Sequence, residues 1–96
     1  MIDTGAQISV IDYGIFKVLQ QITRQVIPLT STRVRPRSLT GEMMSVAGRC
    51  TMTLPGLPRH QFIVCRNLPC PVILGNDFCL RYQVLIDYAE QRVKFN

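Results

Sequence analysis

The sequence predicts a small all-β domain in which short strands close into a barrel-like sheet, accompanied by one or two short helices. Most segments are rich in β-branched residues or alternate between apolar and polar side chains, as strands do. Glycine and proline residues interrupt these segments where turns are expected. The chain of 96 residues has the length of a single domain, and it contains neither an internal repeat nor a low-complexity tract.

The first third of the chain is expected to contain strands on either side of a short helix. Residues 1–11 read as a strand, a turn and a second strand, because they are rich in β-branched residues. Asp12 can cap a helix that continues to about Ile22, although Gly14 weakens this helix. Three side chains at intervals of three are expected to pack in the core: Tyr13, Phe16 and Leu19. Residues 26–29 are expected to form a short strand or edge, since the proline among them removes one ladder donor.

The middle of the chain predicts a long β-hairpin. Residues 33–39 and 42–54 are two extended runs, and the turn between them lies near Thr40 and Gly41. Gly48 indicates a bend or bulge in the second arm. Beyond it the side chains alternate, with one face formed by Cys50, Met52 and Leu54 and the other by Thr51 and Thr53.

The last third is expected to add further strands and a second short helix. A Pro-Gly pair fits the centre of a type II turn that leads into a strand over residues 61–65. Residues 72–75 form a compact apolar strand that ends in glycine, and Asn76 or Asp77 can cap a short helix after it. Residues 84–95 are expected to form a closing hairpin.

Composition and charge limit the possible functions. Hydrophobic residues make up 47% of the chain, which argues against a disordered protein. No apolar run is long enough to span a bilayer, so we expect no membrane partner. The net charge of +5 could suit nucleic acid. However, the arginines in the middle of the chain have no aromatic side chains interleaved with them for base stacking, so we do not expect nucleic acid as a partner of this domain. These arginines are Arg33, Arg35, Arg37, Arg59 and Arg66.

The cysteines do not indicate a metal site. Cys50, Cys65, Cys70 and Cys79 show no C-x-x-C spacing, and His60 is the only histidine. We therefore expect no metal, and reduced thiols in a cytoplasmic setting.

One stretch near the N-terminus places an acidic residue where folds usually avoid one. Asp3, Thr4, Gly5 and Ala6 lie between apolar residues on both sides. A carboxylate in an apolar strand is costly to bury, because desolvation disfavours its charged form. The small residues after it allow a tight turn and a close approach to the carboxylate. The simpler alternative is an Asx-type turn that ends a strand.

This Asp-Thr-Gly-Ala stretch resembles the active-site signature of aspartic proteases, in particular of the retroviral-type (retropepsin) branch. These proteases also carry an apolar-apolar-glycine motif just before a helix near the C-terminus, which Ile73, Leu74 and Gly75 match. Residues 71–78 look like the corresponding segment of gypsy-type LTR retrotransposon proteases. With a hairpin between the two motifs, the resemblance covers essentially the whole chain.

The resemblance implies an aspartic endopeptidase that acts as a homodimer. Each chain supplies one catalytic carboxylate, Asp3, and the mechanism needs two of them. The two carboxylates would share one proton, because like charges in contact do not both ionise easily. The substrate would be an extended polypeptide, and no metal or other cofactor is required.

The resemblance also implies supporting roles for residues of both motifs and of the hairpin. Thr4 would hydrogen-bond across the dimer interface, while Gly5 and Ala6 would complete the active-site loop. The hairpin would be the flap that closes over the substrate. The flap tip and the cleft wall would supply the substrate-binding residues, namely Thr40, Gly41, Glu42, Ile73, Leu74 and Gly75.

Two features depart from the family pattern. Gln7 and Asn76 are uncharged amides at positions where many viral members carry a charged pair, so a neutral hydrogen bond is expected in its place. Met1 lies two residues before Asp3. We therefore expect residues 1–96 to form one domain that lacks the family's first N-terminal strand and dimerises less readily.

Three functions remain open on this basis. The first is a retrotransposon-type protease that cuts its own Gag-Pol-type polyprotein in the cytoplasm or within virus-like particles. The second is a catalytically inactive or domesticated module that dimerises or binds without cleavage. The third is a cellular retroviral-like protease, similar to those of ubiquitin-shuttle proteins or to the skin-type proteases.

Overall fold

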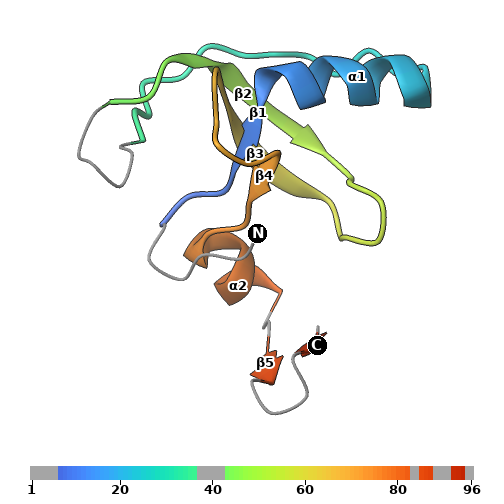
Figure 1. The fold of residues 1–96 in the computed structure, drawn as a ribbon, viewed down its shortest axis with the longest axis vertical. Coiled ribbons are helices and arrows are strands. Elements are labelled where there is room, and N and C mark those ends of the chain that lie inside the picture. The colour runs from blue at the N-terminus through green and yellow to red at the C-terminus, as the bar shows by residue number, and fades with distance from the viewer. Residues whose placement is uncertain (1–6, 37–42, 83–84, 88–91, 95–96) are drawn as a thin grey trace.

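The computed structural model describes residues 7–36, 43–82, 85–87 and 92–94 (Figure 1). Within these residues the chain forms eight elements. In chain order they are β1 (Val10–Asp12), α1 (Tyr13–Thr23), β2 (Val46–Met52), β3 (His60–Cys65), β4 (Val72–Ile73), α2 (Asn76–Arg81), β5 (Leu85–Asp87) and β6 (Arg92–Lys94). No helix in these residues is long and apolar enough to cross a membrane.

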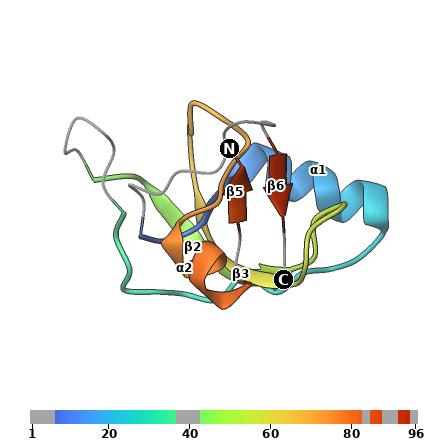
Figure 2. The same ribbon diagram turned by 90° about the horizontal axis from the view of Figure 1, so that it is seen from below.

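Four of the strands form one sheet in the order β2-β3-β1-β4. β1 and β3 are parallel, whereas β2 pairs with β3, and β4 with β1, in antiparallel fashion. β5 and β6 pair with each other as a separate antiparallel hairpin (Figure 2). The predicted class, mostly strands with two short helices, is confirmed, and so is the closing hairpin.

The described sheet is open, so the prediction of a closed barrel is wrong for this part of the chain. β2 and β4 are its two edges, and β5 and β6 add no strand to either of them. The reason lies in β4, which is only two residues long before the chain turns into α2. So short an edge offers little backbone for a further strand to pair with.

The first helix begins where the sequence predicts. Asp12 has an extended backbone, and its Oδ2 accepts a hydrogen bond from the Gly14 N–H at 3.0 Å. Its Oδ1 accepts a second one from the Leu68 N–H at 3.1 Å, which ties the helix start to the loop after β3. Phe16 is buried, and the helix ends at Thr23, with Arg24 as its C-cap in the left-handed conformation.

The segment after the helix is not a strand, contrary to prediction. Its one β-type contact is the antiparallel bridge between Thr30 and Arg49. The Ile27 N–H donates instead to Oε1 of Gln20 in α1, at 2.8 Å. A side chain of the helix therefore draws residues 26–29 away from the sheet, and the proline among them could not have donated to it.

Of the predicted long hairpin, the second arm forms β2 from Val46 onward, whereas residues 33–36 of the first arm form no strand, and the predicted tip falls in residues 37–42, outside the described part. The Met44 N–H donates to the Pro36 carbonyl at 3.0 Å, so the arms run antiparallel close to the tip. The bulge predicted at Gly48 is confirmed by a register shift between Val46 and Gly48. A Cβ at Gly48 would lie 2.8 Å from the Thr30 carbonyl oxygen, so the crossing chain leaves room only for glycine.

The alternation and the turn after it are confirmed as well. The predicted inner face of β2 is buried, whereas Thr51 and Thr53 are exposed. The Leu57 N–H donates to the Leu54 carbonyl, and Gly56 has a φ of 75°, as the third position of a type II turn requires.

The sheet separates two groups of buried side chains. The larger group lies between the sheet and the helices and includes Ile11, Phe16, Met52, Phe62 and Phe78. The smaller one covers the other side of the strands and consists of Val10, Ile63, Cys65 and Ile73. The two inner strands, β1 and β3, contribute to both groups and form the centre of the fold.

Candidate functional site

Most of the predicted site falls outside the described residues. These residues are Asp3, Thr4, Gly5, Ala6, Thr40, Gly41 and Glu42. Their roles therefore stay predictions. What the structure does describe is the second motif and the segment that follows the first one.

The second motif lies directly beside the strand that follows Asp-Thr-Gly-Ala. Ile73 in β4 pairs with Val10 in β1, and both side chains are buried in the smaller core group. Leu74 is buried on the opposite side, in the larger group. The two motifs are therefore brought together by adjacent strands, although they are far apart in sequence.

Gly75 makes the closest approach between the two segments. Its φ of −90° is open to any residue, so its backbone conformation does not require glycine. A Cβ at this position, however, would lie 2.7 Å from the carbonyl carbon of Ile8 and 2.9 Å from its nitrogen. Glycine is needed because the backbone after the first motif passes directly over it.

Gly75 is also the N-cap of α2, where the sequence predicted Asn76 or Asp77. No side chain caps this helix. Asp77 lies two positions after the N-cap, and its carboxylate is bound to other partners.

Asp77 joins the segment after the first motif to the start of α2. Its Oδ1 accepts a hydrogen bond from the Ser9 hydroxyl at 2.7 Å, and its backbone N–H donates to the Gln7 carbonyl at 3.1 Å. The Ser9 hydroxyl in turn accepts from the Gly75 N–H at 3.0 Å. The Ser9 carbonyl accepts from the Ile63 N–H, which adds β3 to the same cluster. The chain just beyond the predicted catalytic loop is thus held by both α2 and the sheet.

His60 completes this buried polar cluster. Its Nε2 lies 3.0 Å from Oδ2 of Asp77, and the residue is only 4% exposed. The ring meets Phe62, Phe78 and Tyr82 edge-on, with centroid distances of 5.1 to 5.9 Å. Its Nδ1 is buried and has no hydrogen-bond partner among the described residues.

The Asp77 carboxylate is stabilised in its charged form. Burial alone would raise the pKa of this group, but hydrogen bonds from Ser9, His60 and the Phe78 N–H outweigh burial and lower the pKa below its ordinary value. Asp77 therefore acts as a fixed anionic acceptor at neutral pH.

The cluster contains a serine, a histidine and an aspartate, but it is not a nucleophilic triad. In such a triad the histidine lies between the other two and takes the proton from the serine. Here the carboxylate lies between Ser9 and His60, and Ser9 is fully buried. The arrangement holds structure together and leaves no base for the hydroxyl.

This cluster was not predicted from the sequence. Ser9 and Asp77 each follow one of the two motifs, and His60 is the only histidine. A polar residue shortly after each motif was a usable signal, but the link to His60 depends on the path of β3.

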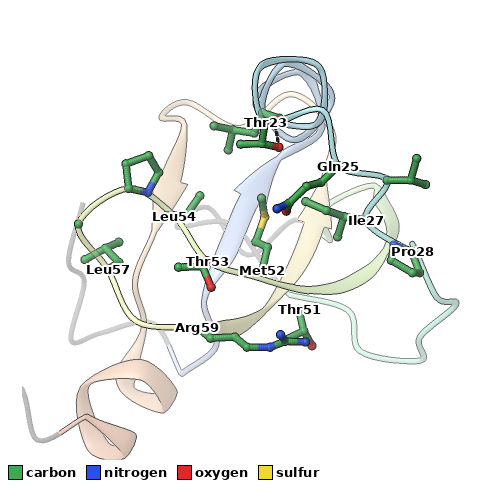
Figure 3. A pocket seen from close by; sticks show the side chains of 14 residues that line it. Thr23, Gln25, Ile27, Pro28, Thr51, Met52, Thr53, Leu54, Leu57 and Arg59 are labelled. Atoms are coloured by element: carbon green, nitrogen blue, oxygen red, sulfur yellow. Dashed lines mark hydrogen bonds between the residues drawn. The ribbon is translucent and has the colours of Figure 1, made fainter.

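The largest surface hollow described here lies away from the predicted site residues and from the cluster of Ser9, His60 and Asp77. It has a volume of about 780 Å³ and lies between the end of α1 and the turn between β2 and β3, and none of the predicted site residues line it (Figure 3). Among the described residues, no three histidine, cysteine or acidic side chains are grouped as metal ligands.

Comparison with models of known protein families finds no match for this chain, and comparison with curated proteins finds none either. The solved structures do contain similar folds. The retroviral protease-like domain of Ddi1 from Leishmania major matches with a TM-score of 0.71 and 22% sequence identity, over 100% of this chain and 72% of that one. The chain therefore has a retropepsin-like fold.

Proposed function

We propose that this chain is an aspartic endopeptidase whose active form is a homodimer, with Asp3 of both chains at a shared catalytic centre. The observation that carries the proposal is the Asp-Thr-Gly-Ala motif shortly before β1 in a chain with a retropepsin-like fold. The contacts of Gly75 and Asp77 with residues 7–9 support it, since they link the two motifs as a rigid active-site loop would require.

The chemistry follows from two carboxylates in contact. Repulsion between like charges leaves one proton shared by the pair. The ionised Asp3 takes a proton from a bound water, which attacks the scissile carbonyl carbon, while the protonated Asp3 of the second chain donates to the carbonyl oxygen. The C–N bond then breaks as a proton passes to the leaving amine, and the pair returns to its singly protonated state.

The substrate class follows from the proposed cleft. A flap with its tip at Thr40, Gly41 and Glu42 would hold an extended peptide by strand-type pairing, which presents alternate side chains to pockets. Apolar side chains beside the cut would suit walls formed near Ile73 and Leu74. The likeness of residues 71–78 to gypsy-type proteases favours a retroelement Gag-Pol-type polyprotein, processed in the cytoplasm or in virus-like particles.

The decisive test is Asp3→Asn, which keeps the shape of the side chain but removes the proton exchange. We expect cleavage of an apolar fluorogenic peptide to fall by at least about a thousandfold, together with loss of pepstatin binding. Sedimentation of the unmodified chain should show a dimer at the concentrations where it cleaves.

Asp12→Asn is the matched control, because it makes the same chemical change in an acid that caps α1 and accepts from the Leu68 N–H. It should leave cleavage within about twofold of the unmodified chain. Cleavage that survives Asp3→Asn would refute the assignment. A folded protein that cleaves nothing at acidic or neutral pH would instead identify a module that binds without turnover.

A further inference from the structure

β2 has an open outer edge beyond Arg49. Arg49 and Thr30 exchange two backbone hydrogen bonds, at 2.7 and 2.9 Å, so the N–H and C=O of Arg49 point away from β3. Along an antiparallel strand, the N–H and C=O groups of successive residues point alternately to one side and to the other. The pairing of β2 with β3 continues unbroken to Met52. The N–H and C=O of Thr51 therefore point outward too, and neither has a partner among the described residues.

The chain's own neighbouring segment does not reach this edge. Continuing the register of the Thr30 bridge would place Pro28 opposite Thr51. Proline has no N–H to donate to the Thr51 carbonyl, and the Ile27 N–H is already bound to Gln20. The segment therefore diverges from β2 and leaves a gap along the exposed backbone.

This gap is the hollow of about 780 Å³ seen in Figure 3. We call it the edge groove and define it by Leu19, Ile27, Pro28, Thr51, Met52 and Arg59. In Figure 3 Met52 and Ile27 lie on the side of β2 that faces α1, whereas Thr51 and Arg59 lie on the other side. One face of the groove is thus apolar and the other polar.

The polar face carries unpaired positive charge. A second hollow of about 370 Å³ shares Pro28, Thr51 and Arg59 with the edge groove and adds Arg49 and Gln61. Arg49 and Arg59 are exposed, and neither forms an ion pair with a carboxylate of the described chain. The whole chain has a net charge of +5, which favours an acidic partner at this face.

We propose that the edge groove binds an extended segment of a partner protein in which acidic and apolar residues alternate. The segment adds to β2 as an antiparallel strand and exchanges two backbone hydrogen bonds with Thr51. The residue opposite Thr51 is acidic, because its side chain points to the face of Arg49 and Arg59. Its two neighbours are apolar, because they point to the face of Met52. The site is separate from the proposed catalytic centre and does not rest on it.

The test uses a capped heptapeptide in which valine and glutamate alternate, titrated into the full chain and followed by amide NMR shifts. We expect saturable binding, with the largest shifts at Thr51 and its neighbours in β2. A peptide with lysine in place of glutamate should bind at least about fivefold more weakly, because attraction becomes repulsion. N-methylation of the glutamate opposite Thr51 should weaken binding by about tenfold, because it removes one backbone hydrogen bond.

Arg59→Gln and Arg33→Gln form a matched pair of variants on the protein side. Both remove one exposed arginine, but Arg33 lines neither hollow. We expect Arg59→Gln to weaken binding by about threefold and Arg33→Gln to leave it unchanged. Equal losses in the two variants would show attraction to net charge alone and overturn the proposal.

Two other results would overturn it as well. The first is the absence of saturable shifts at Thr51 with the valine–glutamate peptide. The second is a pattern of shifts centred on Ile73 and Leu74, which would place the peptide in the proposed cleft. Neither result depends on whether the chain cleaves peptides, so this site and the proposed activity can fail separately.

Discussion

At the scale of single residues, two positions link the motif segments, and each does so in its own way. Gly75 acts by having no side chain, since the backbone of Ile8 occupies the space that a Cβ would need. Asp77 acts by its charged carboxylate, which accepts hydrogen bonds from Ser9, just before β1, and from His60 in β3. Neither role follows from the residue's own neighbours in sequence.

Gly75→Ala should displace the segment after the first motif. The added methyl group would press against backbone atoms of Ile8, which cannot move aside as a side chain could. We expect this overpacking to lower the unfolding free energy by about 3 kcal/mol. Gly56→Ala is the control, because its φ of 75° strains alanine but no atom lies within 4 Å of the added Cβ. It should cost about 1 kcal/mol. Urea unfolding measures the unfolding free energy of both variants. In amide NMR spectra, only Gly75→Ala should shift the signals of residues 7–9. Equal costs with no such shifts would contradict the packing argument.

Asp77 should make the unfolding free energy depend on pH in the acidic range. Its pKa is lowered in the folded protein from the ordinary 3.8, so the unfolded chain takes up a proton first as the pH falls. The stability it contributes is complete above the ordinary pKa and is lost as the pH falls through the folded one. Between about pH 2 and pH 6, the unfolding free energy measured by urea denaturation should therefore change less with pH for Asp77→Asn than for the unmodified chain.

Two further variants separate charge from hydrogen bonding at this site. Ser9→Ala keeps the carboxylate but removes the hydrogen bond that lowers the pKa of Asp77 most, so it should lose much of the acid dependence. Asp77→Ala should cost about 2 kcal/mol at neutral pH, because it leaves the Ser9 hydroxyl and the His60 ring buried without an acceptor. An acid dependence that is identical in Asp77→Asn and in the unmodified chain would disprove the role of this carboxylate.

At the scale of elements, α1 is the part whose start is most clearly explained by local chemistry. Asp12 accepts from Gly14 within the helix and from Leu68 in a distant loop. Asp12→Ala should lower the unfolding free energy by about 1 to 2 kcal/mol, because two backbone donors lose their acceptor. Asp12→Asn keeps only one of the two acceptor oxygens, so it should cost less than Asp12→Ala while still leaving one backbone donor without its acceptor. Thermal or urea unfolding compares them, and equal losses would show that the cap contributes nothing specific.

At the scale of the whole molecule, the two buried cysteines report on the integrity of the core. Cys50 and Cys65 lie in the two different core groups, and burial raises the pKa of each thiol to about 11; the charge of Asp12 adds to the effect on Cys65. Cys70 and Cys79 are only half-buried. At about pH 8, iodoacetamide should label the latter pair in the native protein and the former pair only after global unfolding. Mass spectrometry counts the labels, and four rapid labels without denaturant would contradict the described packing.

The sequence by itself determined the features that depend on neighbouring residues. The Asp12 cap, the alternation along β2, the bulge at Gly48 and the type II turn at Gly56 were all predicted correctly. Each arises from contacts or backbone preferences within a few residues. The two motifs could likewise be read directly, and the placement of Ile73 beside the strand that follows Asp3 agrees with the resemblance they carry.

Only the tertiary structure decided which segments meet. The Gln20 side chain kept residues 26–29 out of the sheet, and the short β4 left the described sheet open. Asp77 forms hydrogen bonds with Ser9, 68 positions away in the sequence, and with His60, 17 positions away. Such contacts depend on how the chain crosses itself. The position of Ser9 and Asp77 after the two motifs was the one local signal, and no local pattern pointed to His60.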